Sequence, residues 1–108
     1  MSKSNQLTNQ ILQFFYEQKS YCWRQNTGGI FDLRKRTYRT GAKKGVSDIL
    51  CCLPPMGRFL AIEVKIPPDK LSPEQEGFLL NVKHSGGSTF VAKDFASFVH
   101  WFKSLSTK

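Results

Sequence analysis

Apolar residues gather in two runs near the middle of the chain, at residues 48–53 and 59–66, and a turn at residues 54–57 separates them. Apart from three charged positions, both faces of each run are apolar. Strands with two apolar faces are typical of sheets that are covered on both sides. The pattern therefore predicts a hairpin of two central strands.

The register of this hairpin follows from its turn. If Leu53 pairs with Arg58, the two residue numbers of every cross-strand pair add up to the same value. Asp48 then lies directly opposite Glu63. Alternate residues of a strand point to the same face, so Lys65 shares a face with Glu63. We therefore expect two carboxylates and one lysine on a single face of the hairpin.

Helical periodicity precedes the hairpin. Apolar residues at helical spacing predict an amphipathic helix over residues 5–18, with Ser4 or Asn5 as its N-cap. A strand over residues 21–25 follows. Residues 30–46 carry little periodicity and much charge, so no regular element is predicted there.

Two further helices follow the hairpin, and the start of the first is marked clearly. Ser72 is a good N-cap, a proline follows at the first helical position, and Gln75 completes a capping box. The glycine pair at residues 86–87 ends this helix. Residues 88–93 then form a short strand, and Asp94 caps a last helix that carries a stripe of phenylalanines.

The predicted order is α-β-β-β-α-β-α. Because no repeat or linker interrupts it, we expect residues 1–108 to form a single α/β domain, a central mixed sheet flanked by helices. No apolar run approaches the roughly 18 residues needed to cross a bilayer, and the polar start does not resemble a signal peptide. We therefore expect a cytoplasmic protein with no membrane partner.

The chain is strongly basic, with 16 Lys and Arg against 8 Asp and Glu and a formal net charge of +8. A charge of this sign favours a polyanionic partner such as nucleic acid. Hydrophobic residues make up 40% of the chain, which argues against disorder.

The three cysteines, Cys22, Cys51 and Cys52, cannot all pair, and neighbours on a strand point to opposite faces. There is no Cys-x-x-Cys spacing and no histidine cluster that could hold zinc. We therefore expect all three to be buried, small apolar side chains with free thiols.

The charged face of the hairpin has the groups that a metal site requires. Like charges directly opposite each other destabilise a sheet, so Asp48 and Glu63 need a cation, and a hard divalent ion such as Mg²⁺ fits. Lys65 would hold an attacking water or stabilise charge on a phosphate, and the Val64 carbonyl would be a third oxygen ligand. The alternative, a solvated ion pair, is disfavoured by the apolar flanks.

Three segments in this order resemble one family. Gly45-Val-Ser-Asp48, Glu63-Val-Lys65 and Leu71-Ser-Pro-Glu-Gln75 are similar to the motifs of virus-type replication-repair nuclease (VRR-NUC) domains, a branch of the PD-(D/E)xK nucleases. Residues 23–29 resemble the strand and turn before these motifs, so the resemblance covers nearly the whole chain. It implies a restriction-endonuclease-like core. One departure is Ser47, where the superfamily name has proline.

The resemblance also implies roles for single residues. Asp48 and Glu63 would bind Mg²⁺ or Mn²⁺, Lys65 would be the catalytic lysine, and Gln75 would lie near the site. Gln75 also has a purely structural explanation as the cap residue of its helix. The family often has a glutamate on the first helix, and Glu17 is the only acid there, so it either reaches the site or faces water.

A basic segment, residues 34–44, leads directly into Asp48. It holds six cations and no acid, and we interpret it as a loop that contacts DNA phosphates without reading bases. Charge runs of this kind are otherwise solvated surface. The expected contacts are Arg34, Lys35, Arg36, Arg39, Lys43 and Lys44, with Arg24 and Asn26 as weaker candidates.

These features predict a small DNA endonuclease that hydrolyses phosphodiester bonds with Mg²⁺ or Mn²⁺. The resemblance suggests a structure-selective enzyme for branched, flapped or Holliday-junction DNA, in the cytoplasm of a bacterium or phage-infected host. A homodimer would present two sites, and Trp101, which lies off the phenylalanine stripe, is expected to be exposed in its interface. One alternative is a non-catalytic basic DNA-binding module. The other is an RNA-binding protein, and this interpretation would leave Asp48 opposite Glu63 unexplained.

Overall fold

The computed structural model describes residues 1–25, 30–32, 37–39 and 44–105. Along these ranges the elements are α1 (Lys3–Glu17), β1 (Tyr21–Arg24), β2 (Ile30–Asp32), β3 (Thr37–Arg39), β4 (Ile49–Leu53), β5 (Arg58–Val64), α2 (Pro73–His84), β6 (Ser88–Ala92) and α3 (Phe95–Leu105). Without β2 and β3, their order is the predicted α-β-β-β-α-β-α. No helix in the described ranges has both the length and the apolar character that crossing a bilayer requires.

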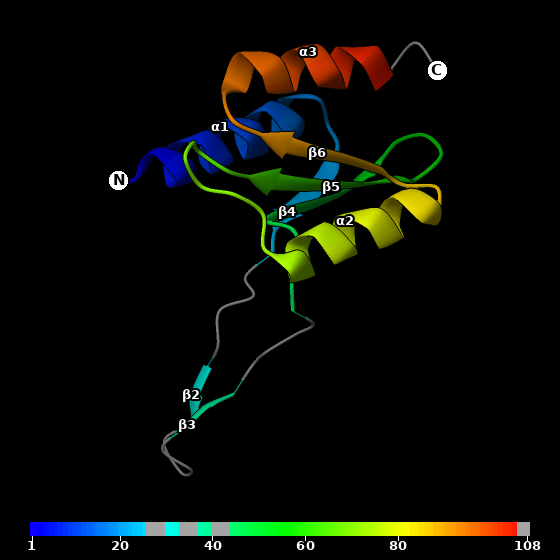
Figure 1. Cartoon of the computed structure of the whole chain (residues 1–108). Coiled ribbons are helices and arrows are strands. Elements are labelled where there is room, and N and C mark those ends of the chain that lie inside the picture. Colours follow the sequence, from blue (N-terminus) through cyan, green and yellow to red (C-terminus); the bar gives the residue numbers. More distant parts are fainter. Residues whose placement is uncertain (26–29, 33–36, 40–43, 106–108) are drawn as a thin grey trace.

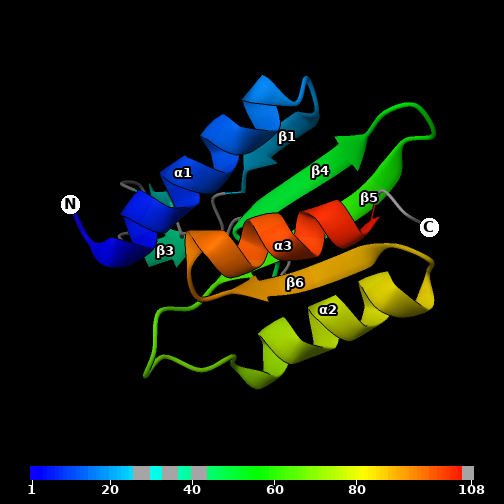
Figure 2. The same cartoon turned by 90° about the horizontal axis from the view of Figure 1, so that it is seen from above.

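β4 and β5 are the central strands of a four-stranded sheet with the order β1-β4-β5-β6. β1 and β5 run antiparallel to β4, and β6 runs parallel to β5, so the sheet is mixed. α1 and α3 cover one face of this sheet, and α2 covers the other (Figure 1 and Figure 2). The structure therefore confirms an α/β fold with two covered central strands.

The predicted register of the central hairpin is confirmed. Leu53 pairs with Arg58 beside the turn, and Ile49 pairs with Ile62 at the other end of the ladder. Every pair in between keeps the same sum of residue numbers. Continuing this register by one residue places position 48 opposite position 63, as the sequence predicts.

Side chains of β5 alternate between two cores. Ile62 and Val64 belong to the core under α1 and α3, whereas Ala61 belongs to the core under α2. Because side chains of a strand alternate with a period of two, Glu63 and Lys65 lie on the same face as Ala61. Both therefore face α2.

The core under α1 and α3 is rich in aromatic rings. Phe14 and Phe15 of α1 meet Phe98 and Phe102 of α3 in edge-to-face contacts, with ring centroids 5.1–5.6 Å apart. Such contacts stabilise a core beyond the burial of apolar area alone. The phenylalanine stripe predicted for the last helix is therefore the surface that joins α3 to α1.

Trp101 is half-buried, and its predicted exposure is wrong. Its ring stacks on Phe90 of β6 with 4.8 Å between the ring centroids, and it packs against the core under α1 and α3. α3 lies over β6 (Figure 2), so the flank of the helix beside the phenylalanine stripe is covered as well. Helical periodicity does not show how wide the covered stripe is.

α1 begins earlier than the sequence predicts. Ser2 is its N-cap, and its Oγ accepts a hydrogen bond from the Asn5 N–H at 3.1 Å. Periodicity favours a cap at Ser4 or Asn5 because the first core residue is Leu7. The first turn of α1 is polar, so the cap rather than the apolar pattern sets where the helix starts.

The capping box of α2 is confirmed. The Ser72 Oγ accepts from the Gln75 N–H at 3.2 Å, and the Gln75 Oε1 accepts from the Ser72 N–H at 2.9 Å. Pro73 is the first residue of the helix, and His84 is the last. The local sequence therefore determines both ends of this element.

The short strands β2 and β3 lie where the sequence predicts no regular element. They pair antiparallel in a separate two-stranded sheet, whose ribbon stands apart from the main sheet in Figure 1. The interpretation of residues 34–44 as a loop is thus corrected at β3. Strands of three residues are too short to show a clear alternation of apolar and polar positions.

The expectation of three free thiols is wrong for two of them. Cys22 of β1 lies opposite Cys51 of β4, and the two form a disulfide with their Cα atoms 4.1 Å apart. Residues directly opposite each other in an antiparallel pair point to the same face, so the pairing of β1 with β4 brings these thiols together. Cys52 is free and half-buried.

Candidate active site

Asp48 lies immediately before β4, at the end of the central hairpin where β5 also ends. Its Oδ2 accepts a hydrogen bond from the Val64 N–H at 2.8 Å. Its backbone carbonyl accepts from the Gln25 N–H at 2.7 Å, which ties it to the end of β1. Two strands therefore hold Asp48 in place, one through its side chain and one through its backbone.

Glu63 is fully buried, with 1% of its surface exposed. Its Oε1 accepts a hydrogen bond from Gln75 Nε2 at 3.3 Å. Its Oε2 is also enclosed and has no hydrogen-bond partner within the described residues. A buried carboxylate oxygen without a donor is costly, so a proton or a cation is expected to accompany it.

The pKa of Glu63 is raised from an ordinary 4.5 to about 9, mainly because the carboxyl is buried. The Asp48 carboxyl raises it further, because it accepts a hydrogen bond from protonated Glu63 and repels the ionised form, whereas the Lys65 ammonium lowers this pKa. In the absence of another cation, the Asp48–Glu63 pair therefore holds a proton at neutral pH.

The Gln75 side chain makes two hydrogen bonds at once. Its Oε1 accepts from the Ser72 N–H, as part of the helix cap, and its Nε2 donates to Glu63. Because the cap occupies the amide oxygen, the amide nitrogen is the group that faces the carboxyl. Gln75 is thus both the cap residue of α2 and the neighbour of Glu63.

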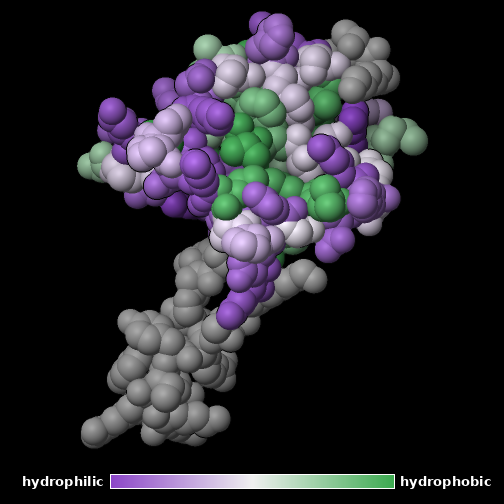
Figure 3. Space-filling model, viewed as in Figure 1, coloured by the Kyte–Doolittle hydropathy of each residue, from purple (hydrophilic) through white to green (hydrophobic). Residues whose placement is uncertain are grey.

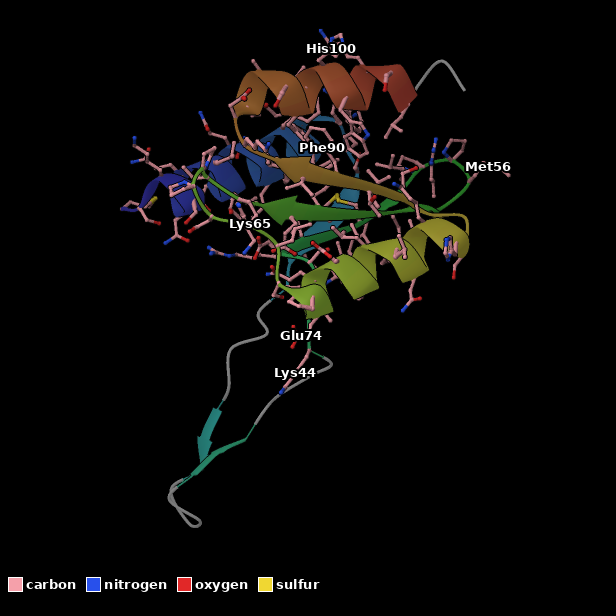
Figure 4. All side chains as sticks on the ribbon, viewed as in Figure 1. Lys44, Met56, Lys65, Glu74, Phe90 and His100 are labelled. Atoms are coloured by element: carbon pink, nitrogen blue, oxygen red, sulfur yellow. A yellow bond between two sulfur atoms is a disulfide. The ribbon has the colours of Figure 1, made fainter. Side chains whose placement is uncertain are left out.

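Lys65 follows Glu63 on the face towards α2 and is half-buried. Its backbone N–H donates to the Ala92 carbonyl of β6 at 2.9 Å. The Val64 N–H points the other way, towards Asp48, and in a strand the carbonyl of a residue points to the same side as its N–H. Figure 4 shows Lys65 near the end of β5, on the side of the molecule where Lys44 and Glu74 lie.

The donor set fits a hard divalent cation. The protein holds one oxygen of each carboxyl, Asp48 Oδ2 through Val64 and Glu63 Oε1 through Gln75, and leaves the buried Glu63 Oε2 without a donor. Within the described ranges, no cluster of three or more His, Cys, Asp or Glu residues could hold a metal. Mg²⁺ is commonly bound by one or two carboxylates together with waters and substrate phosphate oxygens, so two carboxylates are enough.

The structure does not bring Glu17 to this pair. Glu17 is exposed at the end of α1 and lines a surface pocket with Tyr21. Tyr21 pairs with Cys52, far along β4 from Asp48. The helical pattern gives the direction of Glu17 around the helix axis, but only the packing of α1 on the sheet decides which end of the sheet it approaches.

Arg24 lies beside the site but on the opposite face of the sheet. It pairs with Ile49 at the end of β1, and its Nη2 donates to the Asn5 Oδ1 of α1 at 2.7 Å. This bond directs the guanidinium towards α1, whereas Asp48 and Glu63 face α2.

Most of the expected DNA contacts lie outside the described residues. These are Asn26, Arg34, Lys35, Arg36 and Lys43, and for Arg39 only the backbone in β3 is described. Lys44 is exposed in the turn that leads to Asp48 (Figure 4).

Sequence reasoning missed two contacts that frame the site. The Trp23 Nε1 donates to the Gln25 Oε1 at 3.0 Å, which helps to fix the residue that holds the Asp48 carbonyl. Gly45 has a φ of 81° and packs closely on the backbone of Glu74, at the start of α2. A glycine just before Asp48 was the one available signal, since glycine is favoured where two backbones approach closely.

Comparison with known protein families identifies one domain over most of the chain. The family model described as the VRR-NUC domain matches residues 4–95. This range contains the carboxylate pair, Lys65 and Gln75. Neither the curated proteins nor the solved structures gave a match.

Proposed function

Because the chain belongs to the VRR-NUC family of nuclease domains, we propose that it is a metal-dependent DNA endonuclease that hydrolyses phosphodiester bonds. The observation that carries the metal dependence is the Asp48–Glu63 pair, which leaves one buried carboxylate oxygen without a donor. Buried polar atoms are rarely left unsatisfied unless a ligand or a proton completes them.

In this proposal, Asp48 and Glu63 bind Mg²⁺ or Mn²⁺, and the Val64 carbonyl is a third oxygen ligand on the same side of β5. The bound cation supplies Lewis-acid polarisation of the phosphate. Gln75 keeps one oxygen of Glu63 occupied, so that the other oxygen, Oε2, is the one presented to the cation.

Lys65 acts on the reacting groups rather than on the cation, because a charged lysine has donors but no lone pair. Its ammonium lies on the same strand face as Glu63, two residues further along the chain. From there it would donate to the attacked phosphate and stabilise the negative charge that develops as water adds and the bond to the leaving oxygen breaks.

The basic segment, residues 34–44, is proposed to bind the DNA backbone. Lys44 supports this, because it is exposed in the turn only four residues before Asp48. Arg24 and Asn26 would extend the contact from the end of β1. Contacts of this kind to phosphates position a duplex without reading its sequence.

We further propose that the enzyme acts on branched, flapped or Holliday-junction DNA as a homodimer with two sites. Figure 3 shows hydrophobic surface between α2 and α3, beside the edge strand β6, where Phe90 and Val91 are half-buried. An edge strand has unpaired backbone groups, and an apolar patch next to it favours association. A DNA substrate inside a bacterium or phage-infected host would place the protein in the cytoplasm.

The competing function is a non-catalytic DNA-binding module, in which the carboxylates only pair with nearby cations. Pairing of that kind lowers the pKa of a carboxyl. The pKa of Glu63 is instead raised to about 9, although Lys65 acts to lower it. This argues against a structural ion pair and for a site that is completed by a ligand.

Incubation of the purified protein with branched, flapped and linear DNA tests the proposal, with Mg²⁺, with Mn²⁺ and with EDTA. We expect cleavage only when metal is present, fastest on the branched and flapped substrates, and none by the Asp48→Asn variant. Binding without cleavage under all conditions would instead identify a DNA-binding module. Equal cleavage of linear DNA would remove the proposed structure selectivity.

A further inference from the structure

The backbone of Gly45 rests directly on the first turn of α2. A Cβ atom at this position would lie 2.3 Å from the carbonyl oxygen of Glu74 and 3.0 Å from the backbone nitrogen of Gln75. The φ of 81° is also a conformation that side chains rarely adopt. Both the space and the backbone conformation therefore require glycine here.

The turn that Gly45 touches also carries the side chain that reaches Glu63. Gln75 Nε2 lies 3.3 Å from Glu63 Oε1, close to the upper limit for a hydrogen bond. Carbon and oxygen atoms normally stay about 3.3 to 3.6 Å apart even in their closest favourable contacts. An added Cβ would therefore push the two backbones apart by roughly 1 Å, which is enough to break the bond from Gln75 to Glu63.

The Gln75 amide has little freedom to compensate. Its oxygen is held by the Ser72 N–H at 2.9 Å, so the amide moves together with the first turn of the helix. Glu63 cannot follow either, since it lies in the central strand β5 between two paired neighbours. A displacement of α2 would therefore move the Gln75 amide away from Glu63.

We propose that Gly45 is a positioning residue of the nuclease site: its close backbone contact sets the place of α2 and so keeps Gln75 on Glu63. This inference rests on the proposed function of Asp48 and Glu63 as metal ligands. Gly45 also links the basic segment, which ends at Lys44, to Asp48. The contact thus fixes the point where the DNA-binding segment joins the carboxylate pair.

The experiment compares Gly45→Ala with Gly57→Ala. Gly57 has a similar φ of 74°, but no atom lies within 4 Å of the Cβ that alanine would add. Both variants place alanine at a similar positive φ, and only Gly45→Ala is expected to displace α2. The readouts are Mn²⁺ affinity by calorimetry without DNA, and kcat and KM on a branched substrate.

We expect Gly45→Ala to lose about 10- to 100-fold in Mn²⁺ affinity and in kcat, which is the usual effect of removing a partner that orients a metal ligand. KM for DNA should change little, and Gly57→Ala should match the wild type in all three quantities. Equal Mn²⁺ affinity in Gly45→Ala and Gly57→Ala would overturn the inference.

A double variant tests whether Gly45 acts through Gln75. If it does, Gly45→Ala combined with Gln75→Met should lose no more Mn²⁺ affinity than Gln75→Met alone, because both changes break the same hydrogen bond. Losses that multiply would contradict this route. Should Gly45→Ala fail to fold, Gln75→Met decides alone, since an unchanged Mn²⁺ affinity there would remove the link. A wild type that neither binds Mn²⁺ nor cleaves DNA would instead refute the proposed function.

Discussion

Asp48 and Glu63 are two neighbouring carboxyl groups, and burial and mutual repulsion prevent both from being ionised without a cation beside them. Oxygen atoms of both groups are tied to defined partners, Val64 and Gln75. The protein therefore keeps the pair together even though two ionised carboxylates would repel each other. The folded protein is therefore expected to be more stable with a cation bound at this site than without one.

The Asp48→Asn variant distinguishes a metal-binding role of this pair from a purely structural role. The amide oxygen can still accept from the Val64 N–H, and the repulsion between Asp48 and an ionised Glu63 is removed, so the metal-free variant should be as stable as the wild type or slightly more stable. Cleavage and the thermal shift produced by Mn²⁺ should both disappear. Thermal melts with and without Mn²⁺ measure this. A loss of about 3 to 5 kcal/mol in the metal-free variant, with no Mn²⁺ shift in the wild type, would indicate a structural ion pair.

Lys65→Ala is expected to behave differently. Cleavage should be lost because the donor to the phosphate is removed, whereas the Mn²⁺-induced thermal shift should persist because lysine is not a ligand. The same melts, combined with the DNA cleavage assay, distinguish the two variants. Loss of the metal shift in Lys65→Ala would show that Lys65 helps to build the metal site itself.

The raised pKa of Glu63 predicts how stability depends on pH. The folded protein keeps the proton up to about pH 9, whereas an ordinary carboxyl loses it near pH 4.5, so the folded state binds more protons in between. The stability that Glu63 contributes is therefore complete below pH 4.5 and is lost as the pH rises towards 9, by at most about 1.4 kcal/mol per pH unit.

Glu63→Gln removes this titration. Urea unfolding at pH 6 and pH 8.5 without metal should show that the wild type loses more stability between the two than the variant does. Excess Mn²⁺ should reduce the difference for the wild type, because the cation favours the ionised carboxyl. Parallel pH profiles of wild type and variant would be inconsistent with a raised pKa.

At the scale of elements, the edge strand β1 is joined to the central sheet by a covalent bond. Cys22 and Cys51 are 29 residues apart in the sequence and close a loop that contains the basic segment. Cross-links over loops of this length typically stabilise a fold by about 3 to 4 kcal/mol, chiefly by restricting the unfolded chain. The disulfide thus holds β1, which precedes the basic segment in the chain, against β4, which follows it.

Replacing both Cys22 and Cys51 with alanine should lower the free energy of unfolding by about 3 to 4 kcal/mol. A reductant added to the wild type should also lower the free energy of unfolding. The same loss is expected in a reducing cytoplasm. Urea unfolding measures both, with Cys52→Ala as the control because that thiol is free. A wild type whose stability does not respond to reductant would show that the bond does not form in solution.

At the scale of the whole molecule, the net charge of +8 is proposed to act through the basic segment. Changing Lys35, Arg36 and Arg39 to alanine should weaken DNA binding on all sequences alike. Each lost phosphate contact should reduce the slope of log affinity against log salt concentration by about 0.9. A salt titration of DNA affinity measures both effects.

The matched control removes the same charge elsewhere. Lys19, Lys83 and Lys103 are exposed near the ends of the three helices. Their replacement with alanine lowers the net charge equally and should leave the salt slope nearly unchanged. Equal slopes for the two triple variants would mean that DNA responds only to overall charge, and that residues 34–44 are a solvated surface.

The proposed homodimer belongs to the same scale. Sedimentation at assay concentrations should give about twice the 12.3 kDa of one chain, and specific activity on branched DNA should fall when the protein is diluted below the dissociation constant. A 12.3 kDa species with full activity on branched DNA would rule out a requirement for two copies.

Several features of the fold and site could be predicted because short-range interactions determine them. The capping box places Gln75 three residues after Ser72, and the turn between β4 and β5 sets the register that brings Asp48 opposite Glu63. Each of these depends on contacts within one helix turn or one hairpin. The sequence by itself therefore determined the order of the main elements and the identity of the central pair.

Tertiary packing alone decided the rest. Gln75 and Glu63 are 12 residues apart, Cys22 and Cys51 are 29 apart, and Gly45 and Glu74 are also 29 apart. No periodic pattern records which strand is placed beside which, or where a helix end comes to lie on a sheet. For the same reason Glu17, on a correctly predicted helix, lies at the wrong end of the sheet for the site. Contacts between distant segments follow from how complete elements pack, and only the folded chain shows them.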